Sequence, residues 1–169
     1  MIFTAWADGW LDLPGRRARC ALGPAGVRAD KREGDGASPA VTFALRQVLY
    51  RPDRGGRPLT GLPARALAAH DGWCDDPADP AYNRPVSLPY AASAEALWRD
   101  DGVYDLIVVL GHNDAPVVPG AGSAVFMHLA KEGYPPTQGC VALSRPDLEA
   151  LLALAQPGDA LTISQEGAP

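Results

Sequence analysis

The chain has 169 residues, a formal net charge of −5 and 47% hydrophobic residues, which suits a single globular domain with its own core. The negative charge excludes a nucleic-acid binder that works by neutralising phosphates, and no apolar run approaches the ~20 residues that span a bilayer. The 18 glycines and 17 prolines favour turns and short strands over long helices.

The N-terminal part of the sequence predicts a series of short strands. Residues 2–6 and 10–13 flank an Asp-Gly dipeptide, which is typical of a two-residue hairpin turn. Residues 18–22 predict a third strand. Residues 42–50 alternate between apolar and polar side chains and then shift phase, so we expect a strand with a bulge.

Residues 51–92 hold many prolines and little periodicity, so we expect a long irregular insertion there. A loop of that length inside a compact domain is usually functional or flexible, and its length favours a lid over the cleft. We treat the insertion as part of one catalytic domain spanning residues 1–169. Residues 93–99 predict a short helix.

The C-terminal part predicts further strands at residues 105–110, 123–129, 141–143 and 159–164. The runs are short and apolar, as expected of strands that are buried in a sheet. Together with the N-terminal strands, they predict a mainly β domain with one helix near its C-terminus.

That helix has clear signals at both ends. Ser144 is placed to cap it, with Pro146 in the first turn and Asp147 three residues after the cap. We expect Gly158 to end it. Its apolar stripe consists of Leu148, Leu151, Leu152 and Ala155.

A histidine and a cysteine carry the strongest chemical signal. His128 lies near the end of a predicted strand, and Cys140 follows twelve residues later, directly before another strand. If the intervening loop returns the chain antiparallel, the two strand ends lie side by side and the imidazole reaches the sulfur. A neighbouring histidine lowers the pKa of a thiol and takes up its proton. The alternative is a buried structural cysteine and a histidine that hydrogen-bonds a loop.

Gly139 stands directly before the cysteine. With no Cβ it can adopt backbone conformations that are closed to other residues, and it leaves room for a substrate carbonyl. We expect the backbone N–H groups around Gly139 and Cys140 to form an oxyanion hole, which is often the largest electrostatic contribution to acyl transfer.

This arrangement resembles the catalytic signature of the YkuD family of L,D-transpeptidases. In that family a histidine on a strand precedes a Ser-His-Gly-Cys-aliphatic-Arg-aliphatic segment. Here Phe-Met-His occupies residues 126–128 and Thr-Gln-Gly-Cys-Val-Ala-Leu occupies residues 137–143. Residues 31–43 are similar to the family's upstream segment of Lys, Thr-Pro and Gly-x-Phe. The resemblance covers roughly residues 18–164.

The sequence also departs from the family pattern. Gln138 stands where a second histidine is usual, and Thr137 replaces a serine. Ala142 stands where an arginine is usual, Val41 stands where the upstream glycine would be, and the loop between histidine and cysteine is short. Because nucleophile and base both remain, we interpret the chain as a divergent and active member.

The resemblance implies a β-sandwich or β-barrel catalytic domain that acts on a peptidoglycan stem peptide or muropeptide. Cys140 would form a thioacyl intermediate and release the terminal D-alanine, with His128 as base and Gly139 at the oxyanion position. An amine of a second stem would resolve the intermediate by transpeptidation, or water by L,D-carboxypeptidation. The resemblance implies no metal or organic cofactor, and it implies acylation by carbapenem-type β-lactams. A non-catalytic peptidoglycan-binding module is the alternative from another class.

Further residues are candidates for substrate binding. His112 follows a buried strand and is an alternative base or a turn cap, with Asn113 beside it supporting the turn. Arg84 would bind a substrate carboxylate in a bidentate way, unless Tyr82 and Arg84 anchor their own loop. The full predicted substrate-binding set is Thr137, Gln138, His112, Asn113, Tyr82 and Arg84.

The remaining expectations concern the other cysteines and the compartment. Cys20 and Cys74 lack a Gly-Cys turn and a nearby histidine, so neither is predicted to be catalytic, and Cys74 lacks the paired ligands of a metal site. The odd cysteine count fits a reducing compartment. The N-terminal residues do not resemble a secretory signal, so we expect a cytoplasmic monomer, or a periplasmic or cell-envelope protein if a signal has been removed.

Overall fold

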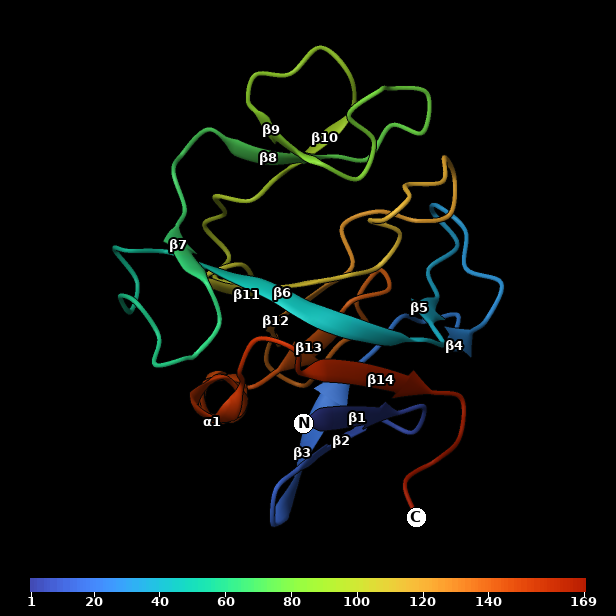
Figure 1. Ribbon diagram of the computed structural model, residues 1–169, viewed down its shortest axis with the longest axis vertical. Coiled ribbons are helices and arrows are strands. Elements are labelled where there is room, and N and C mark those ends of the chain that lie inside the picture. The colour runs from blue at the N-terminus through green and yellow to red at the C-terminus, as the bar shows by residue number, and fades with distance from the viewer.

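The computed structural model describes all 169 residues, and its largest element is a nine-stranded sheet. The strands are β1 (Ile2–Trp6), β2 (Trp10–Leu13), β3 (Arg16–Ala21), β6 (Thr42–Tyr50), β7 (Ala64–Ala66), β11 (Leu106–Leu110), β12 (Phe126–Leu129), β13 (Val141–Leu143) and β14 (Ala160–Ser164). Their order in the sheet is β11-β12-β13-β3-β2-β1-β14-β6-β7, and β6 pairs with β11 as well. This last pairing closes the sheet into a barrel (Figure 1), which confirms the predicted mainly β class.

Two features of the first strands were correctly predicted. β1 and β2 form an antiparallel hairpin whose turn contains Gly9 at a φ of 86°. In β6 the pairing with β11 skips one residue, because Val109 lies opposite Gln47 and Leu110 lies opposite Leu45. The extra residue is the expected bulge. Leu45 and Val48 are three residues apart and would face opposite sides of a regular strand, but the bulge lets both face the core.

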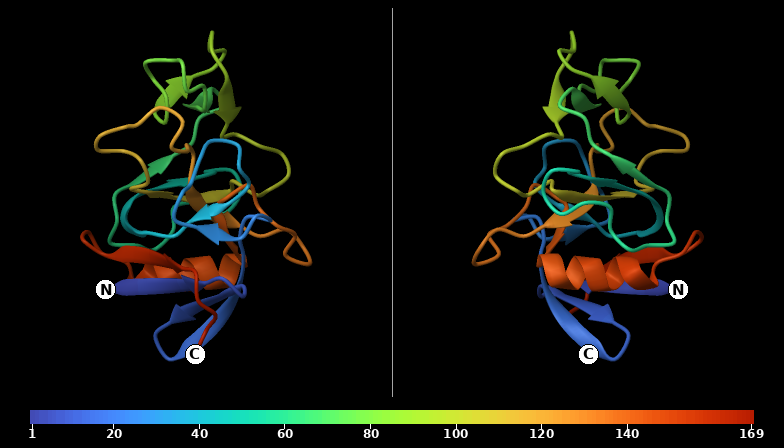
Figure 2. Two further views of the ribbon diagram at one scale, coloured as in Figure 1. Left: turned by 90° about the vertical axis from the view of Figure 1, so that its right-hand side faces the viewer. Right: turned by 90° about the vertical axis from the view of Figure 1, so that its left-hand side faces the viewer.

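Most of the insertion has no regular secondary structure, as predicted, but it also contains short strands that the sequence did not predict. It contains β8 (Asp71–Cys74) and β9 (Pro85–Ser87), which join β10 (Ala94–Ala96) in a three-stranded sheet of order β10-β8-β9. The predicted helix at 93–99 was wrong, since β10 pairs with β8 there. A helix of seven residues is marginal alone, and pairing with β8 satisfies the same backbone groups. Figure 2 shows this small sheet at one end of the molecule and β2 and β3 at the other.

Two hydrophobic clusters lie on opposite faces of β11. Leu106, Val108 and Leu110 belong to the larger cluster inside the barrel. Ile107 and Val109 belong to a second cluster, which includes side chains of the insertion. Burial on both faces explains why β11 is a continuous apolar run. The members of the second cluster are Leu49, Leu67, Trp73, Leu97, Val103, Tyr104, Ile107, Val109, Phe126 and Cys140.

The single helix, α1 (Arg145–Leu154), begins as predicted, and the Ser144 hydroxyl accepts a hydrogen bond from the Asp147 backbone N–H. Leu148, Leu151 and Leu152 are fully buried against the barrel core. The helix ends at Leu154, before the predicted stop at Gly158. The proline at position 157 disfavours helical backbone at the residue before it, which accounts for the earlier end.

We expect Ser144→Ala to lower the free energy of unfolding by about 0.5–2 kcal/mol, because the change removes the cap of α1. The cap bond from Asp147 N to Ser144 Oγ measures 3.2 Å. Thermal or urea unfolding measures the loss. The exposed Ser87 of β9 provides the control variant Ser87→Ala. Equal stabilities of the two variants would contradict the role of the cap.

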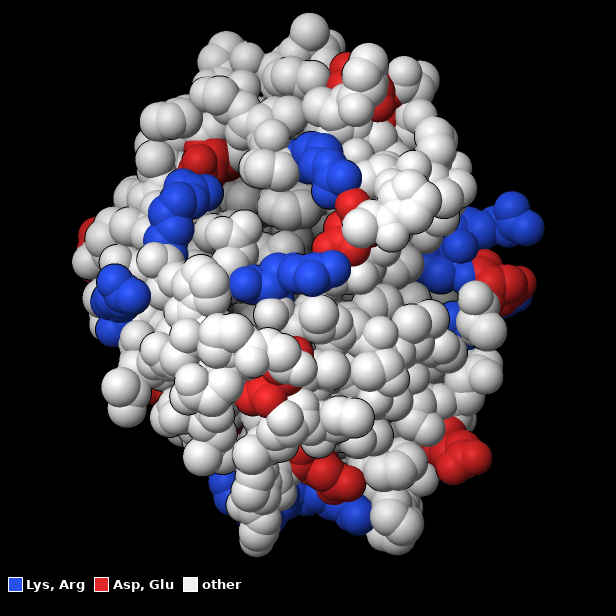
Figure 3. Space-filling model, viewed as in Figure 1, with Lys and Arg blue, Asp and Glu red and all other residues white.

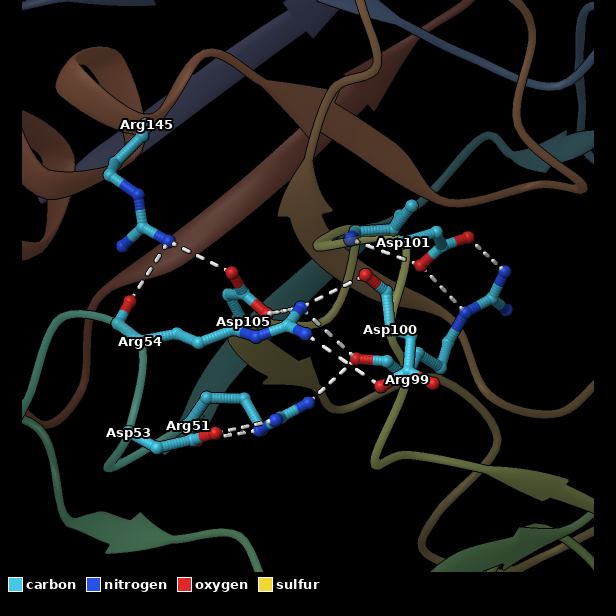
Figure 4. A network of polar contacts seen from close by, with 9 residues as sticks. Arg51, Asp53, Arg54, Arg99, Asp100, Asp101, Asp105 and Arg145 are labelled. Atoms are coloured by element: carbon cyan, nitrogen blue, oxygen red, sulfur yellow. Dashed lines mark hydrogen bonds and ion pairs between the residues drawn. The ribbon is translucent and has the colours of Figure 1, made fainter.

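A network of ion pairs fastens residues 99–105, the segment that precedes β11 (Figure 4). Asp105 accepts from Arg54 at 3.5 Å and from Arg145 of α1 at 3.4 Å. The buried Arg51 donates to the backbone oxygen of Arg99 at 2.6 Å. Because these contacts come from two separate parts of the chain, residues 51–54 and α1, they hold the segment in one place.

The charges of the surface are mixed. On the face drawn in Figure 3, Lys and Arg residues lie among Asp and Glu residues instead of forming one basic patch. The one helix is too short to cross a membrane.

Candidate active site

A cavity of about 590 Å³ contains the central residues of the predicted site. Its wall includes β12, the turn before β13, the polar loop at residues 31–36, and side chains of the small sheet. Five predicted site residues line it, namely Thr137, Gln138, Gly139, Cys140 and His128.

The two strands that carry the cysteine and the histidine are parallel, so the predicted antiparallel return was wrong. His128 lies opposite Ala142 in the pairing of β12 with β13. The chain between the strands is long enough to cross back to the starting edge, as a parallel pair requires. Both side chains nevertheless line one cavity. Met127 and Val141 face the barrel core, so His128 and Cys140 share the other face, toward the cavity.

The Cys140 thiol is buried and hydrogen-bonded in the substrate-free protein. Its exposed fraction is 8%. Sγ donates to the Ala124 carbonyl at 3.3 Å and accepts from the Phe126 N–H at 3.4 Å. Burial raises the pKa of Cys140 to about 12, so the thiol is protonated at neutral pH and its pKa is not lowered by the histidine in this state.

The His128 imidazole is neutral as well. It is 7% exposed, and burial lowers its pKa to about 4. Nδ1 lies 2.9 Å from the Leu129 carbonyl, so we assign the proton to Nδ1 and leave Nε2 as an acceptor. A neutral thiol and a neutral imidazole with a free acceptor therefore line the same cavity, and these are the protonation states from which a thiol can give its proton to a base during attack.

Thr137 holds the turn that presents the cysteine. Its hydroxyl donates to the Cys140 carbonyl at 2.7 Å and accepts from the Gly139 N–H at 3.1 Å. The Thr137 hydroxyl is therefore engaged within the protein. The Cys140 backbone N–H donates to no protein group, which leaves it free for an oxyanion.

Gly139 is required at its position by both backbone and space. Its φ is 121°, and a Cβ there would lie 2.6 Å from the Ala37 carbonyl oxygen. The close neighbour belongs to the upstream loop that contains Lys31, whose side chain is ion-paired with Asp35. The upstream loop and the cysteine turn thus meet at the cavity, although they are distant in sequence.

Comparison with known families decides the identity of this domain. The sequence profile of YkuD, the L,D-transpeptidase catalytic domain, matches residues 2–163. The chain belongs to the YkuD family.

Two solved structures are similar to this YkuD chain at low sequence identity. The helical cell shape determining protein Pgp2 from Campylobacter jejuni is 13% identical, with a TM-score of 0.49 over 99% of this chain and 48% of that one. The L,D-transpeptidase from Mycobacterium smegmatis is 14% identical, with a TM-score of 0.42 over 96% of this chain and 58% of that one. The YkuD chain thus spans about half the length of each. No curated protein sequence gives a significant match.

His112 and Asn113 lie outside the cysteine cavity of this YkuD domain. They line a second cavity of about 300 Å³. The His112 ring packs edge-on against Phe43, and its Nε2 lies 3.1 Å from the Ala121 carbonyl. Asn113 has a φ of 47°, and its side chain bonds the backbone of Val118 in both directions. Both residues stabilise a turn, as the structural alternative predicted.

Tyr82 and Arg84 also lie outside the cysteine cavity. The Tyr82 hydroxyl donates to Glu33 and accepts from the Gly122 N–H. The Arg84 guanidinium donates to the Asp114 carbonyl at 2.8 Å. These contacts anchor the insertion to neighbouring loops and match the alternative of a self-anchored loop.

Several charged and aromatic residues of the cavity were missed by sequence reasoning. Tyr104 donates to Glu95 at 2.7 Å, and burial raises the pKa of Glu95. One oxygen of Asp75, Oδ1, is buried without a hydrogen-bond partner. No local pattern marks these residues, because separate loops, the small sheet and the turn before β11 bring them together only in the fold. The missed residues are Glu33, Asp75, Glu95, Arg99, Tyr104, Ser123 and Lys131.

The other two cysteines are buried and free. Cys20 lies on β3 in the barrel core, and Cys74 lies on β8 in the small sheet. Neither lines the cavity. No group of three or more His, Cys, Asp or Glu side chains is arranged to hold a metal ion.

Proposed function

We propose that this YkuD domain catalyses cysteine-dependent acyl transfer on peptidoglycan stem peptides, with Cys140 as nucleophile and His128 as base. The observation that carries the proposal is that both side chains line one cavity from the same face of neighbouring strands. The free N–H of Cys140 supplies a donor for the oxyanion. All these groups come from one chain, which supports an active monomer.

In the first half of the reaction, the S–H bond of Cys140 turns from Ala124 toward Nε2 of His128. The imidazole takes the proton as Sγ bonds to the carbonyl carbon of the third stem residue. The Cys140 N–H stabilises the oxyanion, with the Gly139 turn holding it in place. Collapse breaks the peptide bond, His128 gives its proton to the departing amine, and D-alanine leaves a thioester on Cys140.

In the second half, the amine of another stem attacks the thioester, and His128 takes one of its protons and returns it to the sulfur. The product is a cross-linked dimer, and this transpeptidation is our main proposal. Water in the place of the amine would give the carboxypeptidase product instead. The same thiol would be acylated by a carbapenem, whose strained lactam presents an equivalent carbonyl.

Mass spectrometry of monomeric tetrapeptide muropeptides incubated with the protein tests the proposal. We expect loss of D-alanine, either as a tripeptide monomer or as a dimer, and no conversion by Cys140→Ala. Cys20→Ala is the matched control, because it removes a buried thiol outside the cavity, and it should convert substrate as the wild type does.

Two outcomes would contradict the proposal. Conversion by Cys140→Ala at the wild-type rate would exclude the cysteine as nucleophile. No conversion by folded wild-type protein with a free Cys140 thiol would favour a non-catalytic binding module.

A further inference from the structure

The imidazole of His128 is fixed by two contacts besides its backbone. Nδ1 bonds the Leu129 carbonyl. The ring also meets the ring of Tyr104 in a T-shaped arrangement, with centroids 5.3 Å apart and planes at 73°. A hydrogen bond alone leaves a ring free to swing about the bond axis, and the edge-on contact with Tyr104 restrains that rotation and so the direction of Nε2.

Tyr104 is itself firmly held. It is 5% exposed, and its ring also packs edge-on against Phe126, the neighbour of the cysteine thiol. The preceding residue, Val103, accepts a hydrogen bond from the Leu129 N–H at 3.0 Å. The turn that carries Tyr104 is therefore bonded to the end of β12, beside the histidine. The ion-pair network around Asp105 holds the same turn from the other side (Figure 4).

The hydroxyl of Tyr104 connects this turn to the small sheet. It donates to Glu95 Oε1 at 2.7 Å, and Glu95 lies on β10, opposite Trp73 of β8. Arg99 lies 3.8 Å from the same carboxylate and over the Tyr104 ring, so the charge of Glu95 is compensated nearby. A bond from tyrosine to carboxylate is short and directional.

We propose that Tyr104 and Glu95 are positioning residues for His128. The Tyr104 ring sets the direction of the imidazole, and Glu95 sets the Tyr104 ring, so the small sheet, in which β10 pairs with β8 of the insertion, takes part in orienting the base. The inference rests on the proposed role of His128, and it assigns the small sheet a contribution to the chemical step.

The test compares kcat and KM on tetrapeptide muropeptides for Tyr104→Leu, Tyr104→Phe and Glu95→Ala. We expect Tyr104→Leu to lower kcat by about 10- to 100-fold with KM nearly unchanged, since a base misplaced by about 1 Å can cost that much. Tyr104→Phe and Glu95→Ala both keep an aromatic ring at position 104 but remove its hydrogen bond to residue 95. We therefore expect about 3- to 10-fold lower kcat in each. Glu95→Gln keeps the acceptor oxygen and should recover most of the Glu95→Ala loss.

A double variant separates positioning from general structural damage. If Tyr104 acts through His128, adding Tyr104→Leu to His128→Gln should cost little beyond His128→Gln alone. Tyr90→Phe is the matched control, because the Tyr90 hydroxyl donates to Asp79 at 2.9 Å and does not line the cavity. It should leave kcat unchanged.

Three results would overturn the inference. The first is wild-type kcat in folded Tyr104→Leu or, where that variant does not fold, in Tyr104→Phe. The second is full additivity in the double variant, which would mean that Tyr104 acts on something other than His128. The third is wild-type kcat in His128→Gln alone, which would also contradict the base in the proposed function and so is distinguishable from the other two.

Discussion

Replacing His128 with glutamine should lower kcat for stem-peptide acyl transfer by about 10²- to 10⁴-fold, the contribution typical of a positioned general base. Glutamine has an N–H donor for the Leu129 carbonyl, but it cannot take up the thiol proton. Steady-state kinetics with tetrapeptide muropeptides measures the change.

His112→Gln is the control for that variant. His112 is partly buried and lines the second cavity, so its replacement should leave kcat within a factor of about two. A large loss in His112→Gln together with wild-type activity in His128→Gln would reverse the assignment of the base.

The expected pH dependence of kcat/KM follows from the burial of His128. The active pair is a neutral thiol and a neutral imidazole, and protonation of His128 blocks proton uptake from the sulfur. Since burial lowers the pKa of His128 to about 4, kcat/KM should fall only as the pH approaches 4. An acid limb near 6.5, the ordinary pKa of histidine, would contradict a buried, neutral base.

Gly139→Ala should lower both stability and activity. The φ of 121° strains any residue with a Cβ, at a cost of about 1–3 kcal/mol, and the contact with the Ala37 oxygen adds to it. To relieve that contact, the turn must move, and the Cys140 N–H moves with it. Because this N–H is the proposed oxyanion donor, we expect about 100-fold lower kcat. Thermal unfolding and kinetics measure the two effects.

Gly133→Ala is the matched control for the backbone strain. Gly133 has a φ of 78° with no atom within 4 Å of its virtual Cβ, so it carries the strain without the steric contact. We expect a modest loss of stability and wild-type kcat. Equal kcat in the two alanine variants would show that the Gly139 turn does not hold the oxyanion donor.

Local patterns were sufficient to predict most strands of the barrel. The alternation in β6 revealed both the strand and its bulge, because side chains on one face of a strand repeat every second residue. The cap signals of Ser144 and Asp147 located the start of α1 for a similar reason, since a cap depends on residues within one turn. The predicted bounds of β13 were correct, whereas β12 begins at Phe126, three residues after the start predicted from its apolar run.

Pairing between distant segments could not be predicted in the same way. The parallel direction of β12 and β13 depends on the path of the loop between them, which the spacing of His128 and Cys140 leaves open. The three-stranded sheet of the insertion arises from pairing between strands of three or four residues, whose sequences have too little periodicity to identify them.

The residues of the candidate site that belong to a sequence motif were predicted, and those that only the fold brings together were missed. Cys140, Gly139 and His128 lie in one short, ordered stretch. Glu95 and Tyr104 reach the cavity through the small sheet and the turn before β11, so only the three-dimensional arrangement reveals them. The same arrangement places His112 and Arg84 at other surfaces, although their sequence neighbourhoods resemble those of functional residues.

The most direct test of the account is the covalent state of Cys140 during turnover. Protein mixed with tetrapeptide muropeptide, quenched in acid and mapped by peptide mass spectrometry, should carry the substrate acyl group without its D-alanine on the peptide that contains Cys140. Turnover by Cys140→Ala, or an acyl group on any other residue, would contradict the central claim.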